Sequence, residues 1–163
     1  MTHSHDAFVE QPLLEPIAAR TRTLLGEEMG IEVLASDPHA TPLERLALQD
    51  YTVMIGVGGG VSLFYVTSYD SGVVDRMVEV LMDGEPVADD ERAEVYESVS
   101  SEIANTIIGN ALPFFPDGGR GTTITPPVSI HDIHQIAVPR KSKVAAQEIR
   151  TALGAVMVYL ISE

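Results

Sequence analysis

The chain has 163 residues, of which 45% are hydrophobic, and this size and composition predict one folded domain over residues 1–163. Its net charge of −14 argues against binding to nucleic acid or to an anionic membrane, because both would repel it. The chain has no cysteine, which excludes disulfides and thiolate zinc sites and fits a reducing cytoplasm. We find no signal peptide and no apolar run long enough to cross a membrane, so we expect a soluble cytoplasmic protein.

The first quarter of the chain predicts one helix and a connector. Residues 1–7 are polar, and we expect them to be disordered. Apolar residues at helical spacing then predict a helix over residues 8–29, and Gly30 suits the position just past its end. Residues 36–44 contain two prolines and predict an irregular connection to the next element.

A β-hairpin is predicted next, with strands over residues 51–57 and 61–68. The two strands are joined by Gly58-Gly59-Gly60. A triple glycine can also form a phosphate-binding loop, but such a loop is followed by Lys-Ser or Lys-Thr and then a helix. Here a strand follows instead, which favours the hairpin.

Two helices are predicted in the middle of the chain. Asp70 is suited to cap a helix over residues 71–83. Either Asp89 or Asp90 could cap a long helix that runs to about residue 111, shortly before two prolines that would stop it.

The rest of the chain predicts strands, at residues 122–125, 129–138, 143–150 and 154–161. The third of these is ambiguous, because Val-Ala-Ala-Gln-Glu-Ile-Arg could also form a helix. The order of elements predicts an α+β fold, a mostly antiparallel sheet with long helices packed on one face.

The long helix is predicted to have two different faces. With about 100° of rotation per residue, Glu102, Asn105 and Gly109 fall within roughly 40° of Ser98. The opposite face is apolar and should pack on the sheet; it includes Tyr96, Val99, Ile103 and Ile107.

This polar row has two possible explanations. A polar outward face is the ordinary state of a surface helix. However, Asn105 and Gly109 are poor helix formers in mid-helix, and packing does not require them on an exposed face. Glu102 and Asn105 would lie side by side, offering an anionic acceptor next to a group that both donates and accepts.

The same stretch resembles the chemotaxis phosphatase family of the CheC, CheX and FliY type. The shared pattern is Ser98, Glu102, Asn105 and Gly109, followed downstream by Pro126-Pro127. The surrounding sequence, Glu-Ile-Ala-Asn-Thr-Ile-Ile-Gly-Asn-Ala, is also similar to that of the family. Only one copy of the pattern is present, as in the CheX branch, which implies a CheX-like fold and a homodimer formed through sheet edges.

The resemblance implies a protein phosphatase that acts on the aspartyl-phosphate of a CheY-like response-regulator receiver domain. Glu102 would pair with a lysine of the receiver, and Asn105 would hold the attacking water. Ser98, Gly109 and Pro127 would support this pair. The chain itself would need no cofactor, because the Mg²⁺ is expected in the receiver.

Two other groups of residues could have a function, as a metal site or as a contact surface. His131 and His134 could be a metal pair, but residues three apart on a strand face opposite sides, which favours an exposed turn or strand end. Arg140, Lys141 and Lys143 form a basic cluster. It is either a solvated turn or a contact for an acidic receiver surface or a partner subunit.

Two functions from other classes stay open at this point. One is a non-catalytic module that binds a receiver or a motor component by the same helix. The other is a structural dimer scaffold in two-component signalling, which would not depend on phosphorylation.

Overall fold

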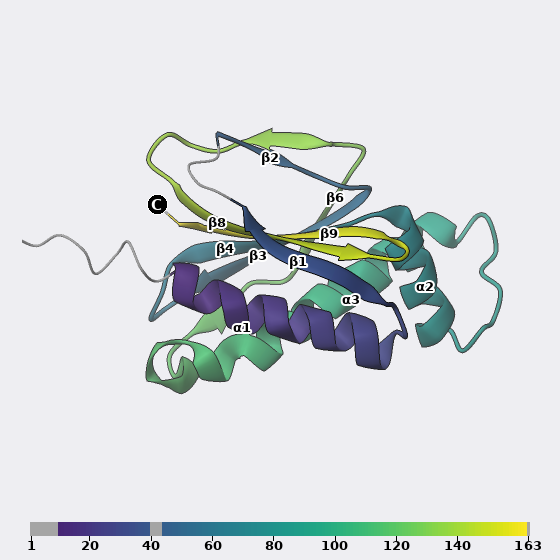
Figure 1. Cartoon of the computed structure of the whole chain (residues 1–163), viewed down its shortest axis with the longest axis horizontal. Helices are drawn as coiled ribbons and strands as arrows, with labels where there is room; N and C mark the ends of the chain where they lie inside the picture. The colour runs from purple at the N-terminus through teal and green to yellow at the C-terminus, as the bar shows by residue number, and fades with distance from the viewer. Residues whose placement is uncertain (1–9, 40–43, 163) are drawn as a thin grey trace, which may run out of the picture.

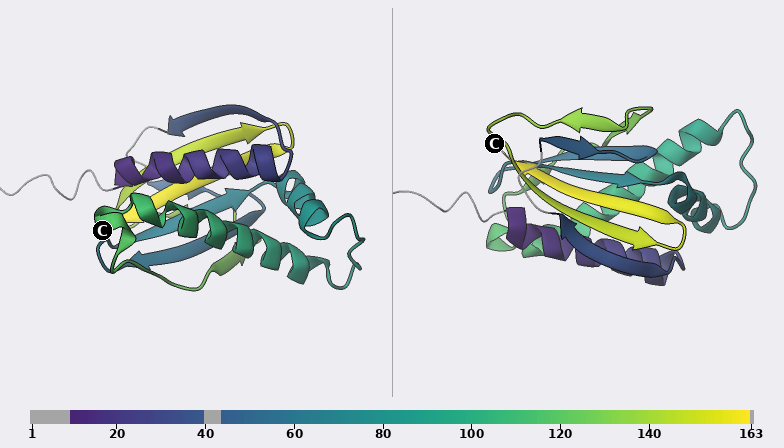
Figure 2. Two further views of the ribbon diagram at one scale, coloured as in Figure 1. Left: turned by 90° about the horizontal axis from the view of Figure 1, so that it is seen from below. Right: turned by 45° about the horizontal axis from the view of Figure 1, so that its top comes forward.

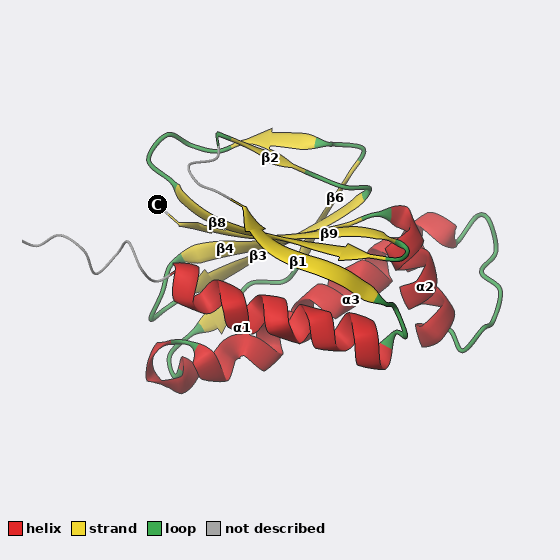
Figure 3. Cartoon of the chain, in the orientation of Figure 1, coloured by secondary structure: helices red, strands yellow, loops and turns green. Residues whose placement is uncertain are grey.

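The computed structural model describes residues 10–39 and 44–162. A seven-stranded sheet forms the middle layer, with helices on one face and a two-stranded sheet over the other (Figures 1 and 3). The strand pairings described are antiparallel. The predicted α+β class is therefore confirmed, whereas the predicted disorder of residues 1–7 lies outside the described residues.

The large sheet has the strand order β1-β8-β9-β4-β3-β5, and β6 also pairs with β3. Its strands are β1 Val33–His39, β3 Tyr51–Gly58, β4 Leu63–Tyr69, β5 Thr123–Ile124, β6 Val128–His131, β8 Lys143–Thr151 and β9 Gly154–Ser162. The small sheet consists of β2 Arg45–Ala47 and β7 Gln135–Ala137. After β6 the chain therefore crosses to the small sheet, where β7 pairs with β2, and it then forms the β8–β9 hairpin of the large sheet.

The helical layer is built by α1 Glu10–Thr23, α2 Ser71–Leu81 and α3 Arg92–Ala111. α1 continues as a π-helical turn, Leu24–Glu28, and α3 is followed by short 3₁₀ turns at Leu112–Phe114 and Pro116–Gly119. α1 and α3 lie side by side across the sheet, and α2 lies at one end (Figure 2). None of the described helices is both long and apolar enough to cross a membrane.

Two apolar clusters hold these layers together. The larger lies between the helices and the sheet and includes Ile17, Ile55, Ile107 and Val158. The smaller lies between the other sheet face and the β2–β7 pair. Burial on both faces explains why β8 does not alternate between apolar and polar residues: Ala145 belongs to the large cluster and Ala146 to the small one. The strand interpretation of residues 143–150 is confirmed.

The triple glycine forms the predicted hairpin between β3 and β4. Gly59 has φ +93°, and a Cβ built on it would lie 1.9 Å from the carbonyl oxygen of Gly121. The backbone approaches so closely there that no side chain fits, which gives this glycine a packing role rather than a phosphate-binding one.

The predicted connector at residues 36–44 was wrong in its first part. Residues 33–39 form β1, which pairs with β8 from Val33 to His39 at the edge of the sheet. Pro38 is tolerated because an edge strand has one side free of ladder hydrogen bonds. The prolines therefore led the sequence to predict a connector where an edge strand begins. Residues 40–43 of the predicted connector lie outside the described residues.

The single strand predicted at residues 129–138 is two strands in different sheets. β6 pairs with β3, whereas β7 pairs with β2. Asp132 lies between them with φ +61°, a left-handed conformation that breaks an extended chain. The turn was not predicted because residues 129–138 have a strand-like sequence throughout.

The predicted start of the long helix also differs. α3 begins at Arg92 with Glu91 at the cap position, so neither Asp89 nor Asp90 caps it. Asp70 does occupy the cap position of α2, but its carboxylate accepts the backbone N–H of Ala155 instead of one from its own helix.

Candidate functional site

α3 has the two faces that its sequence predicts. Its buried residues are Tyr96, Val99, Ser100, Ile103, Ala104, Ile107, Ile108 and Ala111. Ser98, Glu102, Asn105 and Gly109 are all exposed, and we call these four the polar stripe. The helix is therefore fixed to the core along one side and presents the polar stripe along the other.

Glu102 and Asn105 form the centre of the stripe and lie one helical turn apart. Within residues 10–39 and 44–162, neither side chain makes a hydrogen bond or ion pair. Asn110 differs in this respect, because its Nδ2 donates to the carbonyl of Thr106 at 2.6 Å. With respect to the described residues, the Asn105 carboxamide thus has its donor and acceptor available for another molecule.

Gly109 ends the stripe in open space. A Cβ built on it would meet no described residue within 4 Å beyond its own stretch of helix. Packing inside the chain therefore does not require glycine, although glycine in mid-helix costs about 1 kcal/mol relative to alanine. The absence of a side chain leaves the surface beside Asn105 low enough for another molecule to approach.

Pro127, the remaining predicted site residue, does not lie on α3. It is half-buried in the segment between β5 and β6. Strand β6, which follows it, is tied to α3 by the 2.8 Å hydrogen bond between the hydroxyls of Ser101 and Ser129. Pro127 is therefore connected to α3 through the strand that follows it, and its part in the site stays a prediction.

The start of α3 is held by a group of residues that the sequence analysis missed. The Tyr96 hydroxyl donates to Asp75 of α2, and Arg92 pairs with the same carboxylate at 3.1 Å. The Arg92 guanidinium also lies 4.4 Å from the Tyr96 ring centre, and Tyr51 packs on that ring from β3. Burial and the Asp75 carboxylate raise the pKa of Tyr96 to about 12. These contacts fix α3 to both α2 and the sheet.

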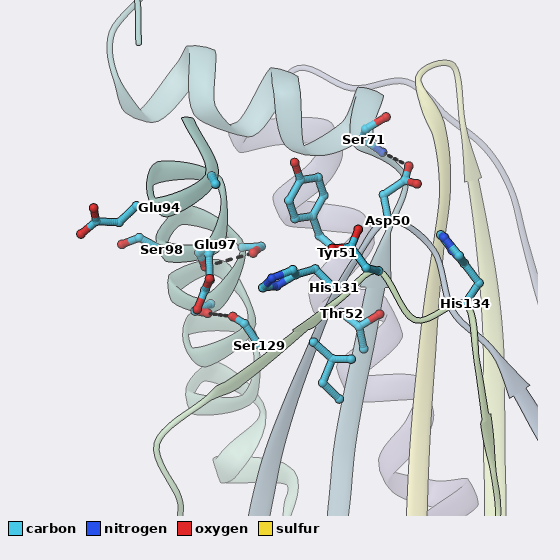
Figure 4. A pocket seen from close by; sticks show the side chains of 15 residues that line it. Asp50, Tyr51, Thr52, Ser71, Glu94, Glu97, Ser98, Ser129, His131 and His134 are labelled. Carbon is cyan, nitrogen blue, oxygen red and sulfur yellow. Dashed lines mark hydrogen bonds between the residues drawn. The ribbon is translucent and has the colours of Figure 1, made fainter. Parts of the chain in front are cut away.

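A groove opens beside the first half of α3, with a volume of about 770 Å³ (Figure 4). One wall is α3 and the other is formed by β6 and the turn after it, with the start of β3 between them. Ser98 of the polar stripe is one of its lining residues. His131 extends its ring from β6 toward α3, where Glu97 and Ser98 lie. Four segments far apart in the sequence meet here, because Ser71 at the start of α2 also lines the groove, so no local pattern could predict it.

The histidine pair of the sequence analysis lines this groove. His131 and His134 both contribute, together with Asp132. Within the described ranges, no group of three or more histidine, aspartate or glutamate side chains is arranged to hold a metal ion. The two histidines are exposed, as expected for a strand end and the turn after it.

The basic cluster lies where β8 begins. Arg140, Lys141 and Lys143 are exposed. None of them forms an ion pair with a described residue. This fits the solvated turn, and a contact with another molecule stays a prediction.

The fold and the polar stripe define a class of protein: an α+β domain whose candidate site is an exposed helix face instead of an enclosed active site. Solved structures share this fold. CheX from Desulfovibrio desulfuricans has a TM-score of 0.77 at 18% identity, covering 92% of this chain and 99% of its own. CheX from Vibrio vulnificus has a TM-score of 0.71 at 15% identity, covering 92% and 96%. A chain of the CheX–CheY–BeF₃–Mg²⁺ complex from Borrelia burgdorferi has a TM-score of 0.68 at 21% identity, covering 94% and 97%.

The family is settled by sequence. The family model described as "Chemotaxis phosphatase CheX" matches residues 51–150, which include the whole polar stripe. No curated protein sequence matches the chain. The match covers more than half of the chain, and the protein belongs to the CheX chemotaxis phosphatase family.

Proposed function

We propose that this protein accelerates hydrolysis of the aspartyl-phosphate of a CheY-like response-regulator receiver domain. The observation that carries the proposal is the pair Glu102 and Asn105, exposed side by side without partners among the described residues, on a helix otherwise packed in the core. Family membership supports it. So does the structural likeness to a CheX solved together with CheY, BeF₃ and Mg²⁺.

Asn105 is the group we assign to the reaction itself. Hydrolysis of an acyl phosphate requires a water in line with the bond between phosphorus and the leaving carboxylate oxygen. A carboxamide can accept from that water and donate to a neighbouring oxygen at the same time. Asn105 would therefore supply position and orientation, a contribution that can be large in phosphoryl transfer.

Glu102 is assigned to docking. Its free carboxylate would pair with the receiver's lysine and fix the helix in register, one turn away from the reacting atoms. The Mg²⁺ and the lysine belong to the receiver.

The rest of the fold fixes the helix backbone that carries the pair. α3 is buried along Ile103, Ile107 and Ile108, and its start is fixed by Tyr96 and Arg92. Because the helix backbone is already held in place, only the two side chains lose freedom when the receiver docks. Ser98 and Gly109 would border the contact. The homodimer stays a proposal.

Phosphate release from phosphorylated receivers encoded near this chain's gene tests the proposal. We expect the wild type to accelerate release, Asn105→Ala to lower kcat about 100-fold, and Glu102→Ala to raise KM about tenfold. Asn110→Ala is the matched control, because this exposed neighbour is engaged with Thr106 and lies off the stripe. Its kcat and KM should match the wild type.

The competing function gives a different result in the same assay. A non-catalytic binding module would bind the phosphorylated receiver without changing the rate of phosphate loss. Its Asn105→Ala variant would behave like the wild type. That outcome with every receiver tried would contradict the proposed phosphatase.

A further inference from the structure

The groove beside α3 is lined by acidic side chains and lacks lysine and arginine among its described lining residues. Among the described residues, four carboxylates line it, those of Asp50, Glu94, Glu97 and Asp132. The remaining lining is made of serine and threonine hydroxyls, two imidazoles and a few apolar groups. A protein segment that enters it would therefore meet a negative, hydrogen-bonding surface.

Most of these charges have no partner in the described part of the chain. Asp50 accepts the backbone N–H of Ser71 at 2.8 Å. By contrast, Glu94, Glu97 and Asp132 make no side-chain hydrogen bond or ion pair with a described residue. Glu97 comes from the helix wall and Asp132 from the turn after β6 on the opposite wall, so a cation between the walls would have a carboxylate on each side. The Glu94 side chain lies farther out, at the rim, and extends away from His131 (Figure 4).

The groove is continuous with the polar stripe. Ser98 belongs to both, and Glu94 lies one turn before it on the same face of α3. A globular domain that covers Glu102 and Asn105 also covers the surface one and two turns away, because specific interfaces bury about 800 Å² on each partner. The part of that domain flanking its reactive pocket would lie over the groove.

We infer that the groove receives a lysine or arginine side chain from the receiver surface next to the acyl-phosphate pocket, and thereby helps to select the receiver. The inference rests on the proposed function for the identity of the partner. A long cationic side chain fits because its alkyl stem can lie along the apolar lining while its charged end reaches the carboxylates. The net charge of −14 would steer a positive surface toward this site.

Charge reversal with a matched control tests the inference. Glu97→Lys changes one exposed helix residue in the groove. Glu27→Lys makes the same change in charge at an exposed residue that does not line the groove and has no described partner. Asp132→Asn removes a charge from the opposite wall, and asparagine tolerates the positive φ found there. Circular dichroism melting curves establish that each variant is folded.

The first readout is the dissociation constant for a receiver loaded with Mg²⁺ and beryllofluoride, measured at low and high salt. We expect Glu97→Lys to weaken binding about tenfold at low salt and less at high salt. We expect a smaller loss for Asp132→Asn and a change below about twofold for Glu27→Lys. Equal losses for Glu97→Lys and Glu27→Lys would mean that only the overall charge matters, and would overturn the inference.

The second readout is rescue from the receiver side. Each lysine or arginine that borders the acyl-phosphate pocket is reversed to glutamate in turn. One of these reversals should weaken binding to the wild type and restore binding to Glu97→Lys but not to Asn105→Ala. If none restores it, the groove does not hold a receiver cation.

These measurements separate the two proposals. A wild type that binds the loaded receiver without speeding phosphate release would refute the phosphatase while the binding data still decide on the groove. Normal phosphate release with unchanged affinity in Glu97→Lys would refute the groove alone. Absence of binding to every receiver would overturn both.

Discussion

Gly109 offers a test in which stability and partner binding move in opposite directions. A Cβ at this position meets no other described residue within 4 Å beyond its own stretch of helix, so alanine can be added without a clash in the described part of the chain. Because glycine is about 1 kcal/mol worse than alanine in mid-helix, Gly109→Ala should stabilise the fold by about that amount. For a domain of this size, this corresponds to a rise of about 2–4 °C in Tm.

A large side chain at residue 109 should interfere with docking of the receiver. Gly109→Leu should be at least as stable as the wild type, but its side chain projects from the stripe beside Asn105. Overpacking a close contact costs ~1–3 kcal/mol, so affinity for the receiver should fall about tenfold. Asn110→Leu is the control, since it adds similar bulk at an exposed neighbour off the stripe.

Calorimetry and a binding titration on the same preparations provide both quantities. Destabilisation by Gly109→Ala would show that the space around this residue is already occupied in solution. Full affinity in a folded Gly109→Leu would show that the receiver does not touch this end of the stripe.

Three further predictions concern the framework of the site. Tyr96→Phe should lower the free energy of unfolding by about 1 kcal/mol in denaturant titrations, because it removes the hydrogen bond to Asp75. Burial raises the pKa of Tyr96 to about 12 and that of Tyr159 to about 12, so the unfolded chain releases these protons first, near pH 10. Stability should therefore be full below pH 10 and fall as the pH rises toward 12, with a shallower fall in Tyr96→Phe. Gly59→Ala should cost about 1–3 kcal/mol in the same titrations, since its Cβ would collide with the Gly121 carbonyl at a positive φ; a neutral effect would mean that this loop can move aside.

The polar stripe could be predicted from sequence because it depends on one helix alone. The 100° rotation per residue places Ser98, Glu102, Asn105 and Gly109 together, and the apolar residues between them identify the buried side. What the two central residues do could not be predicted from spacing, since an exposed glutamate and asparagine are common on surface helices. The resemblance to the CheX family supplied that hypothesis; the family match shows membership of the family, and the roles of the two residues stay a proposal.

The groove and the contacts at the start of α3 could not be predicted, because they depend on tertiary structure. Asp75 and Tyr96 are 21 residues apart and meet only when α2 packs against α3. The groove needs α3, β3 and β6 at once, and β6 was hidden in a longer predicted strand. β1 was missed for a related reason: Pro38 resembles a loop residue until the strand is known to lie at a sheet edge.

The arrangement of Glu102 and Asn105 toward the receiver can be observed directly in a crystal structure of this protein bound to a receiver loaded with Mg²⁺ and beryllofluoride. We predict the Asn105 carboxamide within hydrogen-bonding distance of the position of the in-line water, and the Glu102 carboxylate within ion-pair distance of the receiver's lysine. A complex in which α3 leaves both side chains in solvent, with the receiver bound on another face, would contradict the proposed role of the stripe.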